Sequence, residues 1–116
     1  MTLEREWMRG AAPLAVLTLL DRKEMYGYEL VAALERDSGG LLAMGQSTVY
    51  PLLYNLEARG HVTASKRKAP TGRQRKYYRI TPSGRARLER QRLQWETLVR
   101  AFGHLGVTPG IEEAAP

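Results

Sequence analysis

Uncharged hydrogen-bonding side chains gather between positions 45 and 62, in the stretch GQSTVYPLLYNLEARGHV. Apolar residues recur there at the i, i+3, i+4, i+7 spacing that predicts one buried stripe of a helix, at Val49, Leu52, Leu53 and Leu56. At about 100° per residue, the opposite face carries Ser47, Pro51, Tyr54 and Ala58, flanked by Tyr50 and Asn55. A face that merely meets solvent would more often carry Lys and Glu. Hydroxyl, phenol and amide groups without net charge can exchange hydrogen bonds with base edges.

Positive charge is concentrated directly after this stretch. Ten of the 18 Lys and Arg residues lie between positions 58 and 88, and none of the 12 acidic residues does. An acid-free basic segment on an otherwise acidic chain predicts a polyanionic partner, with nucleic acid ahead of a membrane surface. The alternative interpretation is a solvated loop that happens to be basic. The candidate phosphate-binding residues in this segment are Lys66, Lys68, Arg73, Arg75 and Lys76.

Catalytic and metal-binding constellations are not evident. The chain has no cysteine and only two histidines, His61 and His104, and no His, Asp and Glu residues stand at metal-ligand spacing. No Gly-rich phosphate-binding loop is present. The sequence therefore predicts neither an enzyme nor a bound cofactor or metal. Without cysteines, a signal peptide or an apolar run of about 20 residues, we expect a cytoplasmic protein with no membrane span.

The preceding segments are expected to bury the apolar stripe of this helix. Residues 2–9 can form a short helix, and residues 14–20 are apolar nearly all round, as in a covered helix. A second helix is expected from about Gly27 to Ser38, stopped by two glycines. Leu41 and Leu42 could pair as a short strand. The helix that follows should start near Gln46 or Ser47, with Ser47 as a candidate N-cap.

Residues 61–80 change to the alternating period of strands. The segment KRKAPTGRQRK separates two such runs and contains Pro70 and Gly72 as turn formers. We predict a β-hairpin with a basic tip that is mobile when nothing is bound. Four tyrosines are interpreted as packing residues of the core and hairpin, namely Tyr26, Tyr28, Tyr77 and Tyr78.

A long last helix should begin at Thr81-Pro82, an N-cap Thr followed by an N1 Pro, and end near Phe102 or Gly103. Leu88, Trp95 and Phe102 are spaced by seven, as are Leu98 and Leu105. Such a heptad-like seam needs a partner, and a second copy of the chain is the commonest one. Residues 106–116 are expected to form a flexible tail.

These elements predict a mainly α (α+β) fold, a winged helix-turn-helix with a two-stranded wing and a C-terminal dimerisation helix. Residues 1–80 would form the DNA-binding domain and residues 81–105 the dimerisation helix. Residues 1–12, with Trp7, would either cap the local core or pack on the partner subunit. The third helix would then enter a major groove while the wing meets phosphates. Helix residues expected at the DNA are Gln46, Ser47, Thr48, Tyr50, Pro51, Tyr54 and Asn55. RNA is a minor alternative, because its major groove is too narrow for a helix.

Four motifs in combination resemble the PadR family of bacterial transcriptional regulators. They are G-Y-E-L at 27–30, T-x-Y-P-x-L at 48–53, L-E-x-x-G at 56–60 and K-Y-Y-x-I-T-x-x-G at 76–84. The resemblance covers roughly residues 8–105, and the single C-terminal helix is similar to the compact branch of the family. It implies a homodimeric repressor on a palindromic operator, with Ser47, Thr48, Tyr50 and Pro51 at the DNA and Lys66, Lys68, Arg73 and Lys76 on its backbone.

The resemblance also implies that the last helix exchanges contacts with the partner's N-terminal helix. The residues expected in this interface are Leu3, Trp7, Leu88, Trp95, Leu98, Val99 and Phe102. In some members of the compact branch, a tryptophan on the last helix stacks on flat aromatic effectors. Trp95 and Trp7 are the candidates for such a site here, and ordinary dimer packing is the alternative for Trp95. A winged-helix module that docks an acidic protein is the alternative to a DNA-binding regulator.

Overall fold

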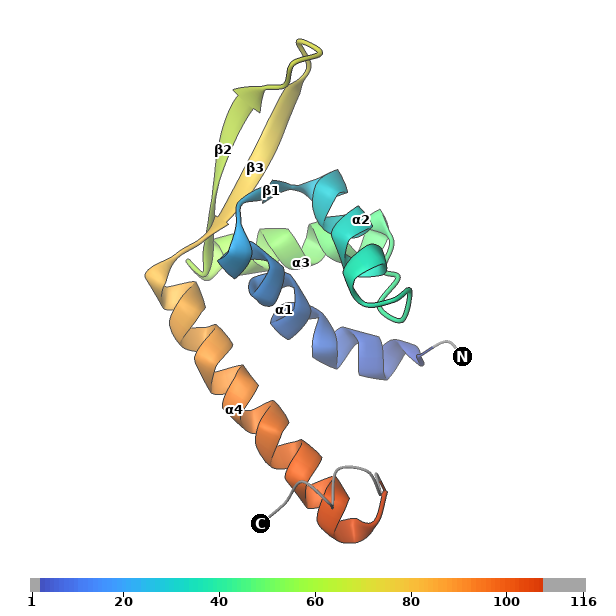
Figure 1. The fold of residues 1–116 in the computed structure, drawn as a ribbon. Coiled ribbons are helices and arrows are strands. Elements are labelled where there is room, and N and C mark those ends of the chain that lie inside the picture. Colours follow the sequence, from blue (N-terminus) through green and yellow to red (C-terminus); the bar gives the residue numbers. More distant parts are fainter. Residues whose placement is uncertain (1–2, 108–116) are drawn as a thin grey trace.

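The computed structural model describes residues 3–107 and contains four helices and three strands (Figure 1). In chain order these are α1 (Arg5–Arg22), β1 (Met25–Tyr26), α2 (Gly27–Asp37), α3 (Gln46–Ala58), β2 (Val62–Lys68), β3 (Gln74–Ile80) and α4 (Pro82–Leu105). The three strands form one antiparallel sheet in the order β1-β3-β2. The architecture is a winged helix-turn-helix of the mixed α+β class, as the sequence predicts.

The core lies where α1, α2, α3 and the base of the hairpin meet. Val49, Leu53 and Leu56 of α3 are completely buried against Leu17 of α1 and Leu30 of α2, among other apolar residues. Leu52, the fourth residue of the predicted stripe, is only half-buried. Burial of this stripe fixes α3 by its inner face and leaves its opposite face exposed.

Several local expectations about the N-terminal half were wrong. The short helix expected at residues 2–9 is the first part of one continuous helix, α1, which includes Pro13. Leu41 and Leu42 lie in a turn, and the third strand is instead Met25–Tyr26, which pairs with Tyr78 and Tyr77 of β3. Ser47 does not cap α3: the N-cap is Gly45, in an extended conformation without a side-chain cap.

The hairpin and α4 leave the body on opposite sides in Figure 1. The β2–β3 register pairs Val62 with Ile80 at the base and Lys68 with Gln74 near the tip, where Gly72 adopts a positive φ of 84°. α4 begins as predicted, since the Thr81 hydroxyl accepts a hydrogen bond from the Gly84 N–H and Pro82 follows the cap. It ends slightly later than expected, at Leu105, and Gly106 closes it. The expected tail lies, beyond Val107, outside the described residues.

Candidate nucleic-acid interface

The outer face of α3 presents the predicted polar residues together. Six of the seven are exposed, Gln46, Ser47, Thr48, Pro51, Tyr54 and Asn55, whereas the seventh, Tyr50, is half-buried. Pro51 has no N–H to donate to the carbonyl of Ser47, so that acceptor has no helical partner. The face therefore offers hydroxyl, amide and phenol groups on a rigid helix that is held from behind by the core.

The start of α3 carries donors without side-chain partners. Gly45 accepts from the N–H groups of Thr48 and Val49 through its carbonyl, but it provides no side-chain oxygen for the first turn. The first turn also has no acidic residue. A helix N-terminus of this kind favours an anion through its free N–H groups and its dipole.

Like charges face one another across the wing. The register places Lys66 opposite Lys76 and Arg67 opposite Arg75. Directly opposed like charges destabilise a strand pair in the absence of an anion. Lys66, Lys68 and Arg73 are exposed, so these three can meet a polyanion without first breaking a contact with a carboxylate.

Lys76 differs from these three residues, because its ammonium group contacts a carboxylate of α3. Lys76 Nζ lies 3.2 Å from Glu57 Oε1 of α3 and 5.3 Å from the centres of the Tyr54 and Tyr78 rings. The hydrogen bond from Lys76 to Glu57 raises the pKa of the Lys76 ammonium. Lys76 thus links the wing to α3.

Arg75 and Arg67 are held on the other face of the hairpin. The Arg75 guanidinium lies 4.3 Å above the ring of Tyr26, and that of Arg67 lies 4.0 Å above Tyr77 and 2.7 Å from a carboxylate oxygen of Glu24. The Tyr26 and Tyr77 rings meet edge to face at 5.5 Å. These contacts stiffen the wing through arginine–aromatic stacking.

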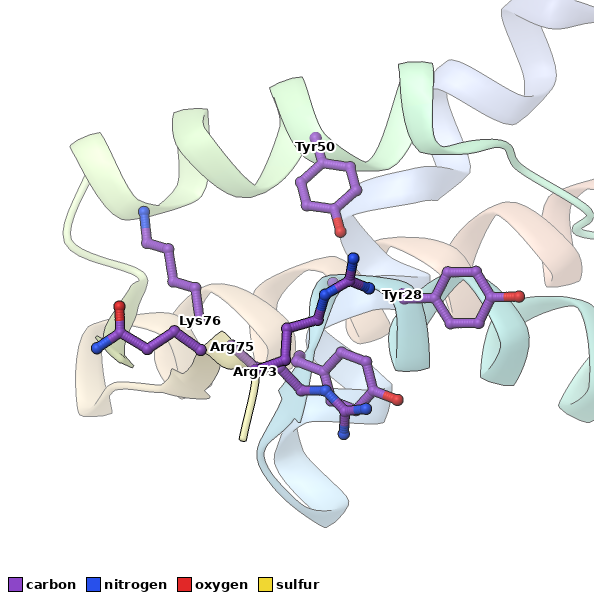
Figure 2. Close-up of a pocket in the computed structure, with 8 residues that line it drawn as sticks. Tyr28, Tyr50, Arg73, Arg75 and Lys76 are labelled. Atoms are coloured by element: carbon purple, nitrogen blue, oxygen red, sulfur yellow. The ribbon is translucent and has the colours of Figure 1, made fainter. Parts of the chain in front are cut away.

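A pocket of about 460 Å³ separates α3 from the wing (Figure 2). Its walls come from β1, from the start of α2, from α3, and from β3 with the turn residue before it: Tyr26, Gly27, Tyr28, Tyr50, Arg73, Gln74, Arg75 and Lys76. Tyr78 is buried, as expected for a packing residue. Tyr28, for which packing was also expected, is instead 59% exposed and lines the pocket. Its position at the first turn of a helix, beside a basic hairpin, is the signal that could have identified it.

The residues expected at the dimer interface differ in their exposure in the single protomer. Leu3, Trp7, Trp95 and Leu98 are exposed apolar side chains, and Val99 and Phe102 are half-buried. Leu88 departs from the expectation, because it is buried in the protomer's own core. Leu93 was not among the residues expected in the interface, but it is 61% exposed. It lines a shallow apolar groove with Thr97, Leu98 and Ala101.

Residues 3–107 contain no group of three His, Asp or Glu side chains placed to hold a metal ion. Within the same residues, no helix has the length and apolar character needed to cross a membrane.

Comparison with known proteins gives consistent matches. The model of the "Transcriptional regulator PadR-like family" matches residues 16–90. A transcriptional regulator of Mycobacterium tuberculosis is 36% identical over 96 residues, which are 83% of this chain and 86% of that protein. A PadR family transcriptional regulator from Eggerthella lenta has a similar structure, with a TM-score of 0.75 at 35% identity over 86% of this chain and 85% of that one. PadR of Bacillus subtilis, solved in complex with operator DNA, matches with a TM-score of 0.65 at 27% identity over 70% of this chain and 46% of its own.

Proposed function

This chain belongs to the PadR-like family of transcriptional regulators, which are not enzymes, and on that premise we propose that it is a homodimeric repressor of the cytoplasm that binds a palindromic operator. The related PadR of Bacillus subtilis has been solved with operator DNA. In the proposed complex, α3 of each protomer enters a major groove and the wing contacts the flanking backbone.

The observation that carries this proposal is the pairing of two different surfaces. The exposed face of α3 is polar and uncharged over its first turns, whereas the adjacent wing exposes Lys66, Lys68 and Arg73. Phosphate contacts supply affinity without sequence information, and hydrogen bonds to base edges supply specificity. A helix fits the major groove of B-form DNA, which is about 12 Å wide. We assign base reading to Thr48, Asn55 and their neighbours, and phosphate binding to the wing.

The exposed apolar side chains support a dimer. Trp7 and Trp95 are 60% and 53% exposed, and they lie on the first and last helices. In a two-fold dimer, α4 of one protomer would cover α1 of the other, so that both tryptophan rings become buried. Two copies of α3 would then face successive major grooves, about 34 Å apart along the duplex.

Regulation would act on the distance between the two recognition helices. A flat aromatic effector that stacks on Trp95, with Trp7 nearby, would repack the dimer centre and change this distance. Coupling of that kind is typically about 1–3 kcal/mol, enough to release an operator. Fluorescence of the two tryptophans, titrated with a panel of flat aromatic compounds, tests this part separately, and no quenching across the panel would leave both rings with a packing role only.

The direct test compares two classes of variant on an operator from the promoter of the chain's own gene. Thr48→Ala and Asn55→Ala should weaken binding to the operator by about 5- to 100-fold while leaving binding to unrelated DNA unchanged, as for lost base contacts. Lys68→Ala should weaken both to a similar extent and reduce the salt dependence. Binding that shows neither salt dependence nor preference for a palindrome would refute the proposal.

A further inference from the structure

The pocket between α2, α3 and β3 is cationic, and none of its lining residues is acidic. Three basic side chains, Arg73, Arg75 and Lys76, contribute to its wall together with three tyrosines (Figure 2). Two of the three cations have partners, since Lys76 pairs with Glu57 and Arg75 stacks on Tyr26. Arg73 is exposed and forms no salt bridge within residues 3–107. Arg73 is therefore the cation of this pocket that can bind an external anion without first breaking a salt bridge.

Tyrosine hydroxyls supply further donors on the opposite side of the pocket. Tyr28 projects from the first turn of α2, and Tyr50 from the second turn of α3. Neither hydroxyl has a hydrogen-bond partner in the described part of the chain.

The position of the Tyr50 ring in this wall depends on Gly27. A Cβ atom placed on Gly27 would lie 2.5 Å from the Cε1, Cζ and hydroxyl oxygen atoms of Tyr50. Only a residue without a side chain lets the phenol lie against the start of α2. The packing therefore positions the Tyr50 hydroxyl near the pocket instead of leaving it free on the outer face of α3.

The location of the pocket indicates which anion it would meet. If α3 occupies a major groove and the wing reaches towards the adjacent minor groove, one backbone strand separates those grooves and must pass between α3 and the wing. The pocket lies between Tyr50 of α3 and Arg73 of the hairpin, along that path. Arginine, tyrosine and helix N-termini are common ligands of DNA phosphates.

We propose that this pocket is a phosphate clamp, in which Arg73, Tyr28 and Tyr50 hold one backbone phosphate of each operator half-site. The clamp rests on the DNA-binding function proposed above and adds a defined contact to it. It fixes how deeply α3 enters the groove, because the phosphate is held between the recognition helix and the wing. Arg75 and Lys76, near the start of β3, position the end of the hairpin turn that carries Arg73.

Operator duplexes with a single methylphosphonate provide the test, since each removes the charge of one phosphate. The modification is moved along the backbone of one half-site, and affinity is measured for the wild-type protein and for Arg73→Gln. At one position, the modification should lower wild-type affinity about tenfold, as expected for a charge-assisted contact. Arg73→Gln should bind the unmodified operator about tenfold more weakly and be insensitive to the modification at that position alone. Tyr28→Phe and Tyr50→Phe should each lose several-fold in affinity and show a reduced effect there.

Lys68→Gln is the matched control, because Lys68 is an exposed wing cation outside the pocket wall. It should bind more weakly but retain the wild-type sensitivity at the clamped phosphate. Thermal unfolding of Arg73→Gln should match the wild type, which excludes a folding defect. If a methylphosphonate changes the affinity of Arg73→Gln and of the wild type equally at every position, the clamp is overturned. Operator binding by the wild type would still stand in that case. If the wild type shows no operator preference, the proposed function fails first.

A small phosphate-containing ligand could bind the same residues as a DNA phosphate. A second measurement distinguishes these two sources of phosphate. Inorganic phosphate and a nucleoside monophosphate are titrated into the DNA-free protein by calorimetry. The clamp predicts no saturable binding of either in the low millimolar range, because a single exposed site in water holds a small anion weakly. Saturable binding that Arg73→Gln abolishes, combined with no position-specific methylphosphonate effect, would reassign the pocket to a soluble ligand and overturn the clamp.

Discussion

A missing side chain at Gly27 determines where the ring of Tyr50 lies. Gly27 is buried at the first position of α2, and the phenol of Tyr50 occupies the space that a methyl group would need. Because the contact is made by the far end of a flexible side chain, the ring can move away at small cost. The glycine therefore matters for the placement of Tyr50 more than for the stability of the fold.

Gly27→Ala should leave the protein folded and weaken operator binding several-fold. The new Cβ displaces the Tyr50 ring from the pocket wall, whereas the helical backbone accepts alanine readily. Thermal unfolding and fluorescence anisotropy with a labelled operator check the two parts. In a Tyr50→Ala background the same substitution should have no further effect on affinity; an equal loss in both backgrounds would show that Gly27 does not act through Tyr50.

His61 stands among cations at the junction of α3, β2 and α4. Burial, followed by the charges of Arg87, Arg59 and Arg90, lowers the pKa of the His61 imidazole below its ordinary value near 6.5. Its Nδ1 lies 3.1 Å from the hydroxyl of Ser83. When the pH falls through 6.5, the unfolded chain takes up a proton at this position before the folded protein does. Stability should therefore decline from pH 6.5 down to the folded pKa and change no further below it.

Chemical denaturation between about pH 5 and pH 7.5 tests this prediction. His61→Gln should lose less stability over this range than the wild type does, whereas His104→Gln, at the exposed end of α4, should behave as the wild type. An NMR titration of the imidazole gives the folded pKa directly. A His61 pKa at or above 6.5 contradicts the prediction.

At the scale of elements, close contacts connect the base of the wing to the start of α4. Thr81 donates its hydroxyl to the carbonyl of Gly60 at 2.6 Å and accepts from the N–H of Gly84. A Cβ at Gly84 would overlap the carbonyl oxygen of His61, which is backbone and cannot move aside. The start of α4 is thereby fixed to the base of the wing, and this contact sets the direction in which the helix leaves the body.

Gly84→Ala should destabilise the protein by about 1–3 kcal/mol, as overpacking does. Gly10→Ala is the opposite case, since Gly10 lies within α1 and a Cβ added there would have no neighbouring atom within 4 Å. That substitution should stabilise by about 0.5–1 kcal/mol through helix propensity. Urea denaturation of the two variants checks the pair. A Gly84→Ala protein as stable as the wild type would show that these contacts can relax.

Periodicity predicted the elements whose burial follows a regular pattern. The inner stripe of α3, the alternation of the wing and the Thr81-Pro82 start of α4 are all present in the structure. The pattern fails where only two residues define an element. Leu41-Leu42 and Met25-Tyr26 look alike as short apolar pairs, and only the tertiary position beside β3 makes the second pair a strand. The cap of α3 was misplaced because the extended Gly45 starts the helix without a side-chain oxygen.

The sequence predicted which types of residue lie at the candidate site better than it predicted which residues they contact. Leu88 fits a heptad seam, but a seam residue and a core residue have the same apolar character, and the fold buries Leu88 within the protomer. Lys76 and Arg75 are basic wing residues in the sequence, yet Glu57 and Tyr26 approach them only after the hairpin docks on the helices. Contacts between residues this far apart in the chain carry no local sequence signal.

At the scale of the whole molecule, several exposed apolar side chains lie on the first and last helices. The molecule is 53 Å long, and α4 extends away from the helical body (Figure 1). Trp7, Leu93 and Trp95 are each more than half exposed. Exposed apolar side chains of this size are consistent with an interaction surface, and a second copy of the chain is the partner expected by the proposed function.

Trp95→Asp should convert a dimer into a monomer in light scattering at micromolar concentration. Operator affinity should fall by about 30-fold or more, because a buried aromatic anchor of an interface is typically worth at least about 2 kcal/mol. Leu41→Asp is the matched control: Leu41 is 60% exposed, but it lies in the turn between α2 and α3. It should remain a dimer. A wild-type protein that is monomeric at this concentration contradicts the dimer.

The most direct test of sequence reading by α3 is the selection and sequencing of DNA fragments bound by the purified protein. The wild type should enrich a palindrome whose half-sites lie about one helical turn apart. Asn55→Ala should enrich the same palindrome with relaxed preference at one symmetric pair of positions, and Lys68→Ala should enrich it unchanged but more weakly. Fragments without a common motif, or a motif that Asn55→Ala and Thr48→Ala leave intact in every position, would contradict the assignment of base reading to α3.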